Sequence, residues 1–227
     1  MDKDNGMSGM VPLAVGDSAV ELYWMDTGQL EDETLYARAY WSLSRVRREK
    51  VDSFLYRKDK KLSLGAGLLL RQGLAARGID EREAVLAYGV HGKPCLAEYP
   101  DIHFNLSHSG GMAIAVFADA AVGCDIELVE RADMALAEKF FSKKEYQYLA
   151  GFSDKRQQDE AFYRLWTLKE SFVKAAGVGL TLPLSAYEIE ISADENAGVC
   201  QNVDTAAYAF GEYRFGRYCA AVCLRGK

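Results

Sequence analysis

The stretch "VGCDIELVE", residues 122–130, combines an apolar strand pattern with two acidic side chains. Successive side chains of a strand point to opposite faces. The apolar face is formed by Val122, Cys124, Ile126 and Leu128. Asp125 and Glu127 share the other face, about 7 Å apart, where like charges repel unless water or a cation lies between them. The pair fits either the hydrated face of an antiparallel strand or part of a cation site with oxygen ligands.

The length and charge of the chain restrict the class of protein. Its 227 residues allow one domain, or two of about 110 residues each. A formal net charge of −6 disfavours a general nucleic-acid binder. The N-terminal "MDKDNGMSGMVPLAVGD" is acidic where a signal peptide is basic, and the longest apolar runs are too short to cross a bilayer. We expect no nucleic-acid partner and no membrane association.

The cysteines and histidines indicate the redox compartment and argue against zinc. Five cysteines are present without a CxxC pair, and an odd number favours reduced thiols over a disulfide framework. Three histidines without HExxH spacing leave little material for a zinc site. The sequence therefore predicts a cytoplasmic protein.

The order of helical and strand patterns predicts an α+β fold in two similar halves. Along the first 128 residues, we expect a strand at 19–26, helices within 32–61 and 62–79, and strands at 84–90, 102–107, 112–118 and 122–128. In the second half, we expect helices at 134–141, 142–152 and 157–177, and strands at 186–193 and 213–224. This pattern predicts a pseudo-twofold pair of α/β subdomains, 1–119 and 120–227, each a small, mostly antiparallel sheet packed with helices.

A third acidic side chain lies in "LWTLKESFVKAAGVGL", residues 165–180. Helical spacing places Glu170 and Lys174 four residues apart, away from the apolar stripe that includes Leu168 and Phe172. The two form either an ordinary ion pair, or a site in which Glu170 joins Asp125 and Glu127 while Lys174 meets a phosphate held by the cation.

Two other polar stretches are candidate anion sites. "FNLSHSGG", residues 104–111, places Ser107, His108 and Ser109 before a Gly-Gly turn, where they either bond the local backbone or hold a phosphate. A serine hydrolase is disfavoured because the G-x-S-x-G pattern is absent. Residues 45–61 hold eight Lys or Arg, which form a solvated helix face or a patch for an anionic ligand. "HGKP" places Lys93 on a hairpin loop.

Together, "GKPCLAEYPDIHFNLSHSGG", "VGCDIE" and "FYRLWTLKESFVKAAGVGL" resemble the 4′-phosphopantetheinyl transferases of the surfactin-synthetase-activating type. The resemblance covers residues 47–191, and the three motifs occur in the family's order. It implies a monomer of two similar halves with the active site between them. Such enzymes transfer the phosphopantetheine arm of coenzyme A to a serine of an acyl, peptidyl or aryl carrier protein and release adenosine 3′,5′-bisphosphate. The compact trimeric holo-synthases have chains about half as long, so the length favours the monomeric type.

The resemblance assigns roles to residues of this sequence. It implies that Mg²⁺, with Mn²⁺ as an alternative, is held by Asp125, Glu127 and Glu170. The implied coenzyme A contacts are Arg47, Lys50, Lys93, Pro94, Ser107, His108 and Lys174, with Lys174 on the pyrophosphate and Arg47, Lys50, Lys93 and Pro94 near the 3′-phosphate. Glu170 is the expected general base, and Lys174 is expected to stabilise the leaving bisphosphate.

One position departs from the family pattern, because Leu62 stands where an arginine is frequent. We expect Lys60 or Lys61 to replace its charge. Two hypotheses compete with the transferase. The first is a non-catalytic module that binds an acidic partner through residues 45–61. The second is a hydrolase of coenzyme A that uses the same cation site with water as nucleophile.

Overall fold

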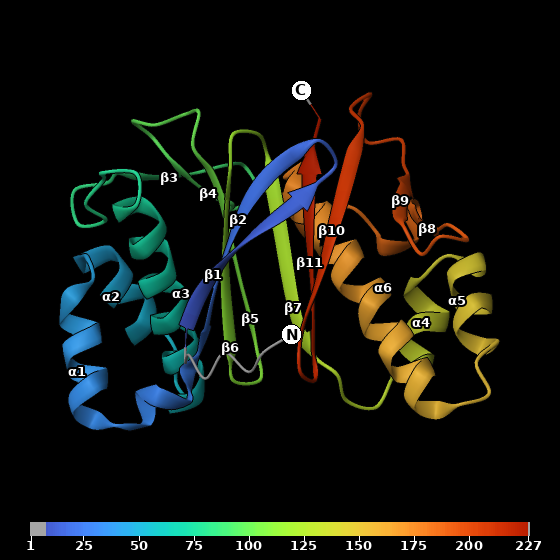
Figure 1. Cartoon of the computed structure of the whole chain (residues 1–227), viewed down its shortest axis with the longest axis horizontal. Helices are drawn as coiled ribbons and strands as arrows, with labels where there is room; N and C mark the ends of the chain where they lie inside the picture. The colour runs from blue at the N-terminus through green and yellow to red at the C-terminus, as the bar shows by residue number, and fades with distance from the viewer. Residues whose placement is uncertain (1–7, 227) are drawn as a thin grey trace.

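Two antiparallel sheets pack face to face at the centre of the molecule, and helices cover the outer side of each (Figure 1). The computed structural model describes residues 8–226, apart from the side chain of Leu180. The inner faces bury a continuous apolar layer between the sheets. From the first sheet it contains Val20, Leu22, Ile114 and Val116, and from the second Val122, Cys124, Ile126, Ala220 and Val222. This shared core joins the two halves.

The first half contains a four-stranded sheet in the order β1-β2-β6-β5. Its strands are β1 (Ser8–Val15), β2 (Ser18–Asp26), β5 (His103–Ser109) and β6 (Met112–Ala118). Its helices are α1 (Glu33–Ser42), α2 (Arg45–Asp52) and α3 (Arg57–Ala75), preceded by the 3₁₀ turn η1 (Thr27–Glu31). A separate hairpin joins β3 (Leu86–Tyr88) to β4 (Pro94–Leu96). Apolar side chains of α3 pack on the outer face of this sheet.

The second half contains a three-stranded sheet in the order β10-β11-β7. Its strands are β7 (Val122–Leu128), β10 (Tyr208–Phe215) and β11 (Tyr218–Arg225). Its helices are α4 (Met134–Phe140), α5 (Lys143–Ala150) and the long α6 (Lys155–Ala176). The 3₁₀ turns η2 (Gly179–Thr181) and η3 (Leu184–Ala186) lead to a hairpin of β8 (Glu188–Ile191) and β9 (Ala197–Cys200). The predicted mixed fold with small antiparallel sheets in two similar halves is confirmed.

Several element boundaries differ from the sequence prediction. The helical stretch 32–61 is interrupted at Leu43, because Ser44 begins a new helix by accepting a hydrogen bond from the Arg47 amide. The strand predicted at 213–224 is wrong as one element, since the chain reverses at Gly216 in the left-handed region. β1, β4 and β9 were not predicted. Residues 1–7 of the N-terminal stretch lie outside the described residues.

Two further sequence expectations bear on the environment of the protein. All five cysteines are free thiols, as their odd number indicated. Within residues 8–226, no helix is both long and apolar enough to cross a membrane. The division of the chain at residues 119 and 120 stays a prediction.

Gly123 determines how closely α6 approaches β7. A methyl group at this position would overlap the carbonyl oxygen of Ser171 and lie 2.8 Å from the carbonyl carbon of Lys174. Because these are backbone atoms, α6 must shift to admit a side chain. We expect Gly123→Ala to lower the free energy of unfolding by about 1–3 kcal/mol, measured by urea denaturation.

A matched control is Gly198→Ala, where the nearest atom to an added methyl group is 3.9 Å away. This control is expected to change stability by less than about 0.5 kcal/mol. Equal stability losses in the two variants would show that α6 does not rest on the Gly123 backbone.

Candidate active site

Helix α6 crosses the polar face of β7, so that acidic and basic side chains of the two elements meet. Asp125 and Glu127 point to this side of β7, while Cys124 and Ile126 are buried between the sheets. The predicted division of the strand into an apolar and an acidic face is therefore confirmed.

Asp125 and Lys174 form the centre of the cluster. Asp125 is 4% exposed, and its Oδ1 accepts hydrogen bonds from Lys174 Nζ at 2.7 Å and from Ser107 Oγ at 2.8 Å. Burial acts to lower the pKa of Lys174, but the charge and hydrogen bond of Asp125, together with Cys124 and Glu170, raise it overall. Of the two alternatives for Glu170 and Lys174, the simple ion pair is not formed, because Lys174 pairs with Asp125 within the described residues.

Glu127 and Glu170 border the same space. Ser109 Oγ donates a hydrogen bond to Glu127 Oε2 at 2.5 Å, whereas Glu170 accepts no hydrogen bond from the described residues. Burial raises the pKa of Glu127 to about 7, with further contributions from Asp125 and Glu170. Burial also raises the pKa of Glu170. Glu127 and Glu170 therefore resist ionisation, chiefly because they are removed from water, and the nearby carboxylate of Asp125 acts in the same direction.

The fit of these carboxylates to a cation depends on their unused oxygens. Across residues 8–226, no three His, Cys, Asp or Glu side chains lie close enough to form a closed metal site. However, the buried Oδ2 of Asp125 has no hydrogen-bond partner, and Glu170 accepts no hydrogen bond from the described residues. Buried oxygens without donors, next to carboxylates with raised pKa values, are suitable ligands for a hard divalent cation.

Strand β5 supplies polar side chains that bind β7 across the junction of the two sheets. The Cys124 amide donates to Asn105 Oδ1 at 2.9 Å, and the Leu128 amide donates to Ser109 Oγ at 3.3 Å. β5 and β7 belong to different sheets and are not paired through backbone hydrogen bonds. The side chains of Asn105, Ser107 and Ser109 connect the two strands instead. Ser109 belongs to the predicted anion site with Ser107 and His108, whereas Asn105 was not predicted as a site residue. The signal for Asn105 was its spacing of two residues from Ser107, which places both on one strand face.

His108 lies on the opposite face of β5 from Ser107. It pairs with Ala113 of β6 and is exposed on the side that α3 covers. Partial desolvation lowers the pKa of its imidazole, and Lys174 acts in the same direction while Asp59 opposes it. The structure therefore brings Ser107, but not His108, into hydrogen-bond contact with Asp125 and Lys174.

The basic residues predicted to contact coenzyme A have different environments. Lys50 is exposed on α2, and Arg47 on the same helix donates a hydrogen bond to the Ser63 carbonyl at 3.2 Å. The buried Nε of Arg47 has no partner, and burial lowers the pKa of its guanidinium. Lys61 forms an ion pair with Glu31 and is 9% exposed.

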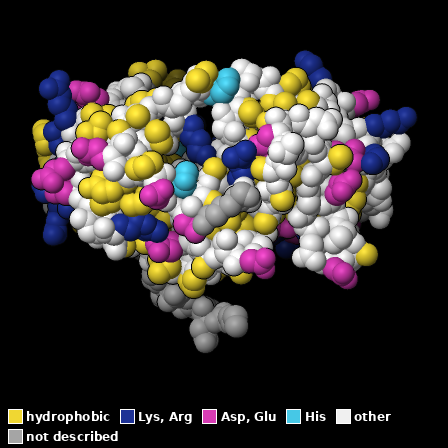
Figure 2. Space-filling view, turned by 90° about the horizontal axis from the view of Figure 1, so that it is seen from above, with side chains coloured by type: hydrophobic (Ala, Val, Ile, Leu, Met, Phe, Trp, Pro, Cys, Tyr) yellow, Lys and Arg dark blue, Asp and Glu magenta, His cyan; other side chains and the backbone are white. Residues whose placement is uncertain are grey.

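The other two predicted contacts, Lys93 and Pro94, lie beside Lys174. They line a cavity of about 170 Å³ together with Asn105, Lys174 and the loop after α6. Lys93 Nζ donates to the carbonyls of Lys174 and Val122, so one N–H bond remains for another acceptor. Figure 2 shows Lys and Arg side chains around a hollow between the two halves, with a histidine at its edge.

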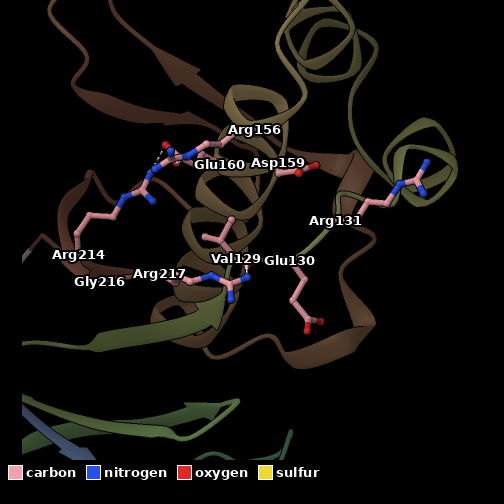
Figure 3. A pocket seen from close by; sticks show the side chains of 9 residues that line it. All are labelled: Val129, Glu130, Arg131, Arg156, Asp159, Glu160, Arg214, Gly216 and Arg217. Carbon is pink, nitrogen blue, oxygen red and sulfur yellow. Dashed lines mark hydrogen bonds and ion pairs between the residues drawn. The ribbon is translucent and has the colours of Figure 1, made fainter.

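A separate cavity of about 510 Å³ lies beyond the end of β7 and contains none of the predicted site residues (Figure 3). Its charges are largely satisfied locally. Glu160 lies 3.2 Å from Arg156 and 3.7 Å from Arg214, and Arg217 donates to the Val129 carbonyl at 2.9 Å. This cavity offers no cluster of free carboxylates, so we assign it no chemistry.

Comparison with known proteins places this site in a family. Residues 121–223 match the model of the 4′-phosphopantetheinyl transferase superfamily, and residues 31–119 match a 4′-phosphopantetheinyl transferase N-terminal model. The chain is 35% identical over 158 residues to 4′-phosphopantetheinyl transferase Sfp of Bacillus subtilis (strain 168), covering 69% of this chain and 70% of that protein. It is 33% identical over 177 residues to the transferase ffp of Bacillus subtilis, covering 78% of each.

A solved structure of a holo-(acyl-carrier-protein) synthase from Bacillus anthracis in complex with CoA (3′,5′-ADP) covers 48% of this chain and 97% of its own. The sequence identity is 15% and the TM-score 0.38. The identity to Sfp and the two family models rest on far more of the sequence. By these matches, the chain belongs to the 4′-phosphopantetheinyl transferases of the Sfp type.

Proposed function

We propose that this protein transfers the 4′-phosphopantetheine arm of coenzyme A to a serine of an apo carrier protein, with Mg²⁺ as cofactor, and releases adenosine 3′,5′-bisphosphate. The observation that carries the proposal is the cluster between β7 and α6, where Asp125, Glu127 and Glu170 influence one another electrostatically and Lys174 pairs with Asp125. This composition suits a pyrophosphate held by a divalent cation.

In the proposed reaction, the serine oxygen forms a bond to the β-phosphorus of coenzyme A. The bond from that phosphorus to the bridging oxygen breaks, and the bisphosphate leaves with that oxygen. Glu170 accepts the serine proton, because it accepts no hydrogen bond from the described residues and burial raises the pKa of its carboxyl group. Lys174 stabilises the charge that develops on the leaving group.

The divalent cation would act only on the charge of the pyrophosphate, while the side chains of the protein carry out the proton transfer and bind the leaving group. Asp125, Glu127 and Glu170 would hold Mg²⁺, or Mn²⁺ in its place, since both take oxygen ligands. When bound, the ion neutralises charge on the pyrophosphate. The chain's own contribution is to bury the carboxylates and to hold Asp125 with Ser107 and Lys174.

The remaining coenzyme A contacts are proposed from their position around the hollow. Lys174 and Ser107 meet at the cluster and would bind the pyrophosphate. His108, on the α3 side of β5, would bind a phosphate together with Arg47 and Lys50. Leu62 is 8% exposed, and its neighbour Lys61 is paired with Glu31, so Lys60 is the better substitute for the missing arginine.

We further propose a cytoplasmic monomer that binds no nucleic acid or membrane. The free thiols, three of them buried, support a reducing compartment. The acidic net charge supports the absence of nucleic-acid binding.

Lys143 and Lys144 at the start of α5 are candidates for carrier contact because carrier proteins of this system are generally acidic. Lys144 is 77% exposed although it pairs with Glu188 at 2.8 Å. We expect Lys143→Glu with Lys144→Glu to raise KM for the carrier about tenfold while KM for coenzyme A stays unchanged. The matched control is Lys155→Glu with Arg156→Glu at the start of α6. An equal change in both KM values would remove α5 from carrier docking.

The proposed function is tested by intact-mass measurement of apo carrier proteins mixed with the protein and coenzyme A, with Mg²⁺ or with chelator. A gain of one phosphopantetheine only with Mg²⁺ supports the transfer and its metal dependence. Release of free phosphopantetheine without a carrier would favour the hydrolase. No gain on acyl, peptidyl and aryl carriers, in folded protein that binds coenzyme A, would favour the binding module.

A further inference from the structure

The tip of the β3–β4 hairpin, residues 89–94, reaches from the first half of the molecule to the end of α6. The hairpin turns through Gly92 in the left-handed region, and the Gly89 amide donates to the Lys93 carbonyl at 2.9 Å. His91 packs on Gly179, where an added Cβ would lie 2.8 Å from the His91 Cβ. The hairpin tip is therefore in close contact with the loop that follows α6.

Lys93 continues this contact into the last turn of α6. Its Nζ donates to the Lys174 carbonyl at 2.6 Å and to the Val122 carbonyl at 2.8 Å. α6 ends at Ala176, and Gly177 follows in the left-handed conformation. The last carbonyls of a helix have no intrahelical partner and carry the negative end of its dipole, so an ammonium group is favourable there.

Within residues 8–226, no carboxylate acts on the charge of Lys93. Burial lowers the pKa of its ammonium group to about 8. The neighbours that act to raise this pKa are the thiols of Cys95, Cys124 and Cys223. At neutral pH the group is still mainly charged. The helix end and the first carbonyl of β7 therefore take the place of a counterion. This explains how a buried lysine is tolerated here without an acidic partner.

Lys93 also stands between two hollows. It lines the cavity of about 170 Å³ beside Lys174, and a second, mostly apolar cavity of about 510 Å³ that extends along β4 and the start of β5. A side chain that ties both α6 and β7 at this point restricts their movement into either space.

We propose that Lys93 is a positioning residue that caps the C-terminal end of α6 from the other half of the molecule and so holds the Lys174 ammonium against Asp125. Its effect on the reaction rests on the proposed function. The capping contact itself does not depend on the proposed function, because it is made in the protein without substrate. This role is additional to the expected contact of Lys93 with coenzyme A, for which one N–H bond remains.

Hydrogen–deuterium exchange of the protein without substrate tests the cap. Lys93→Met keeps the apolar length of the side chain and removes its donors. We expect exchange of amides in residues 173–178 to accelerate about tenfold or more, while residues 155–165 exchange as in the wild type. Lys58→Met, an exposed lysine of the same half, is the matched control and should alter neither segment.

Kinetics separate positioning from ligand binding. If Lys93 positions Lys174, Lys93→Met lowers kcat about tenfold, in addition to any rise in KM for coenzyme A that follows from the lost contact. Unchanged exchange at the end of α6, together with a raised KM for coenzyme A, would overturn the proposal. Faster exchange in a protein whose wild type modifies no carrier would leave the cap standing and reject the proposed function.

A second variant keeps the test informative if Lys93→Met does not fold. Lys93→Gln retains two N–H donors on a shorter side chain that cannot reach both carbonyls. We expect a smaller acceleration of exchange at residues 173–178 than in Lys93→Met and partial recovery of kcat. Exchange equal to that of the wild type along all of α6 in both variants would exclude a capping role.

Discussion

Replacing Glu170 by glutamine is expected to lower the rate of phosphopantetheine transfer by about 10²–10⁴-fold, the usual contribution of a general base. The change removes one negative charge and preserves the shape of the side chain. Since Glu170 is unpaired and only partly buried, its loss should not unfold the protein. Intact-mass assays over time give the rate, and circular dichroism checks the fold.

Glu160→Gln is the matched control on the same helix, because Glu160 lies in the separate charged cavity and pairs with Arg156. It should transfer at close to the wild-type rate. Near-normal turnover of Glu170→Gln would exclude Glu170 as the base. An equal loss of transfer rate in both variants would indicate that the substitutions destabilise α6 and do not remove a catalytic base.

Replacing Lys169 by methionine is expected to destabilise the protein by about 3–5 kcal/mol, because it leaves a buried carboxylate without its partner. Lys169 is fully buried and donates to both Glu145 oxygens, at 2.7 and 2.9 Å, and to the Tyr187 carbonyl at 3.1 Å. Glu145 also accepts from the amides of Ser142 and Ile189. Urea denaturation measures the loss.

The exposed pair Arg45–Glu49 gives the control for this prediction. Its side chains are 83% and 59% exposed, so Arg45→Met should leave the stability close to that of the wild type. The double variant Lys169→Met with Glu145→Gln should recover part of the lost stability, since it no longer buries an unpaired charge. A loss for Lys169→Met as small as that for Arg45→Met would show that the buried pair contributes little.

Lys169 and Glu170 show how one helix serves two purposes. Adjacent residues of a helix point in directions about 100° apart. Lys169 therefore joins α6 to α5 and β8, while Glu170 faces the acidic side of β7. The sequence pattern identified Glu170 through its spacing to Lys174. It contained no sign that Lys169 would be buried, because its partner Glu145 lies 24 residues away.

Local patterns were sufficient for some features of this protein. Alternation along residues 122–128 predicted the acidic face of β7, because the direction of a strand side chain depends only on its position. The spacing of glycines and apolar residues likewise predicted the end of α6 near Gly177. The family motifs, which combine residue type with spacing, identified the transferase and its candidate residues.

What the sequence by itself determined is therefore the class of fold, the acidic strand face and the family. Only the tertiary structure decided which charges meet. Lys174 could pair with Glu170 on its own helix, but it pairs with Asp125, because β7 presents a buried carboxylate that must be compensated. In the same way Lys93 was read as a phosphate ligand on a turn, and only the packing of the hairpin against α6 gives its ammonium two backbone carbonyls. Which residues distant in the sequence pair with one another depends on which side chains are buried and on how closely whole helices and strands approach. Local sequence spacing contains no information on either.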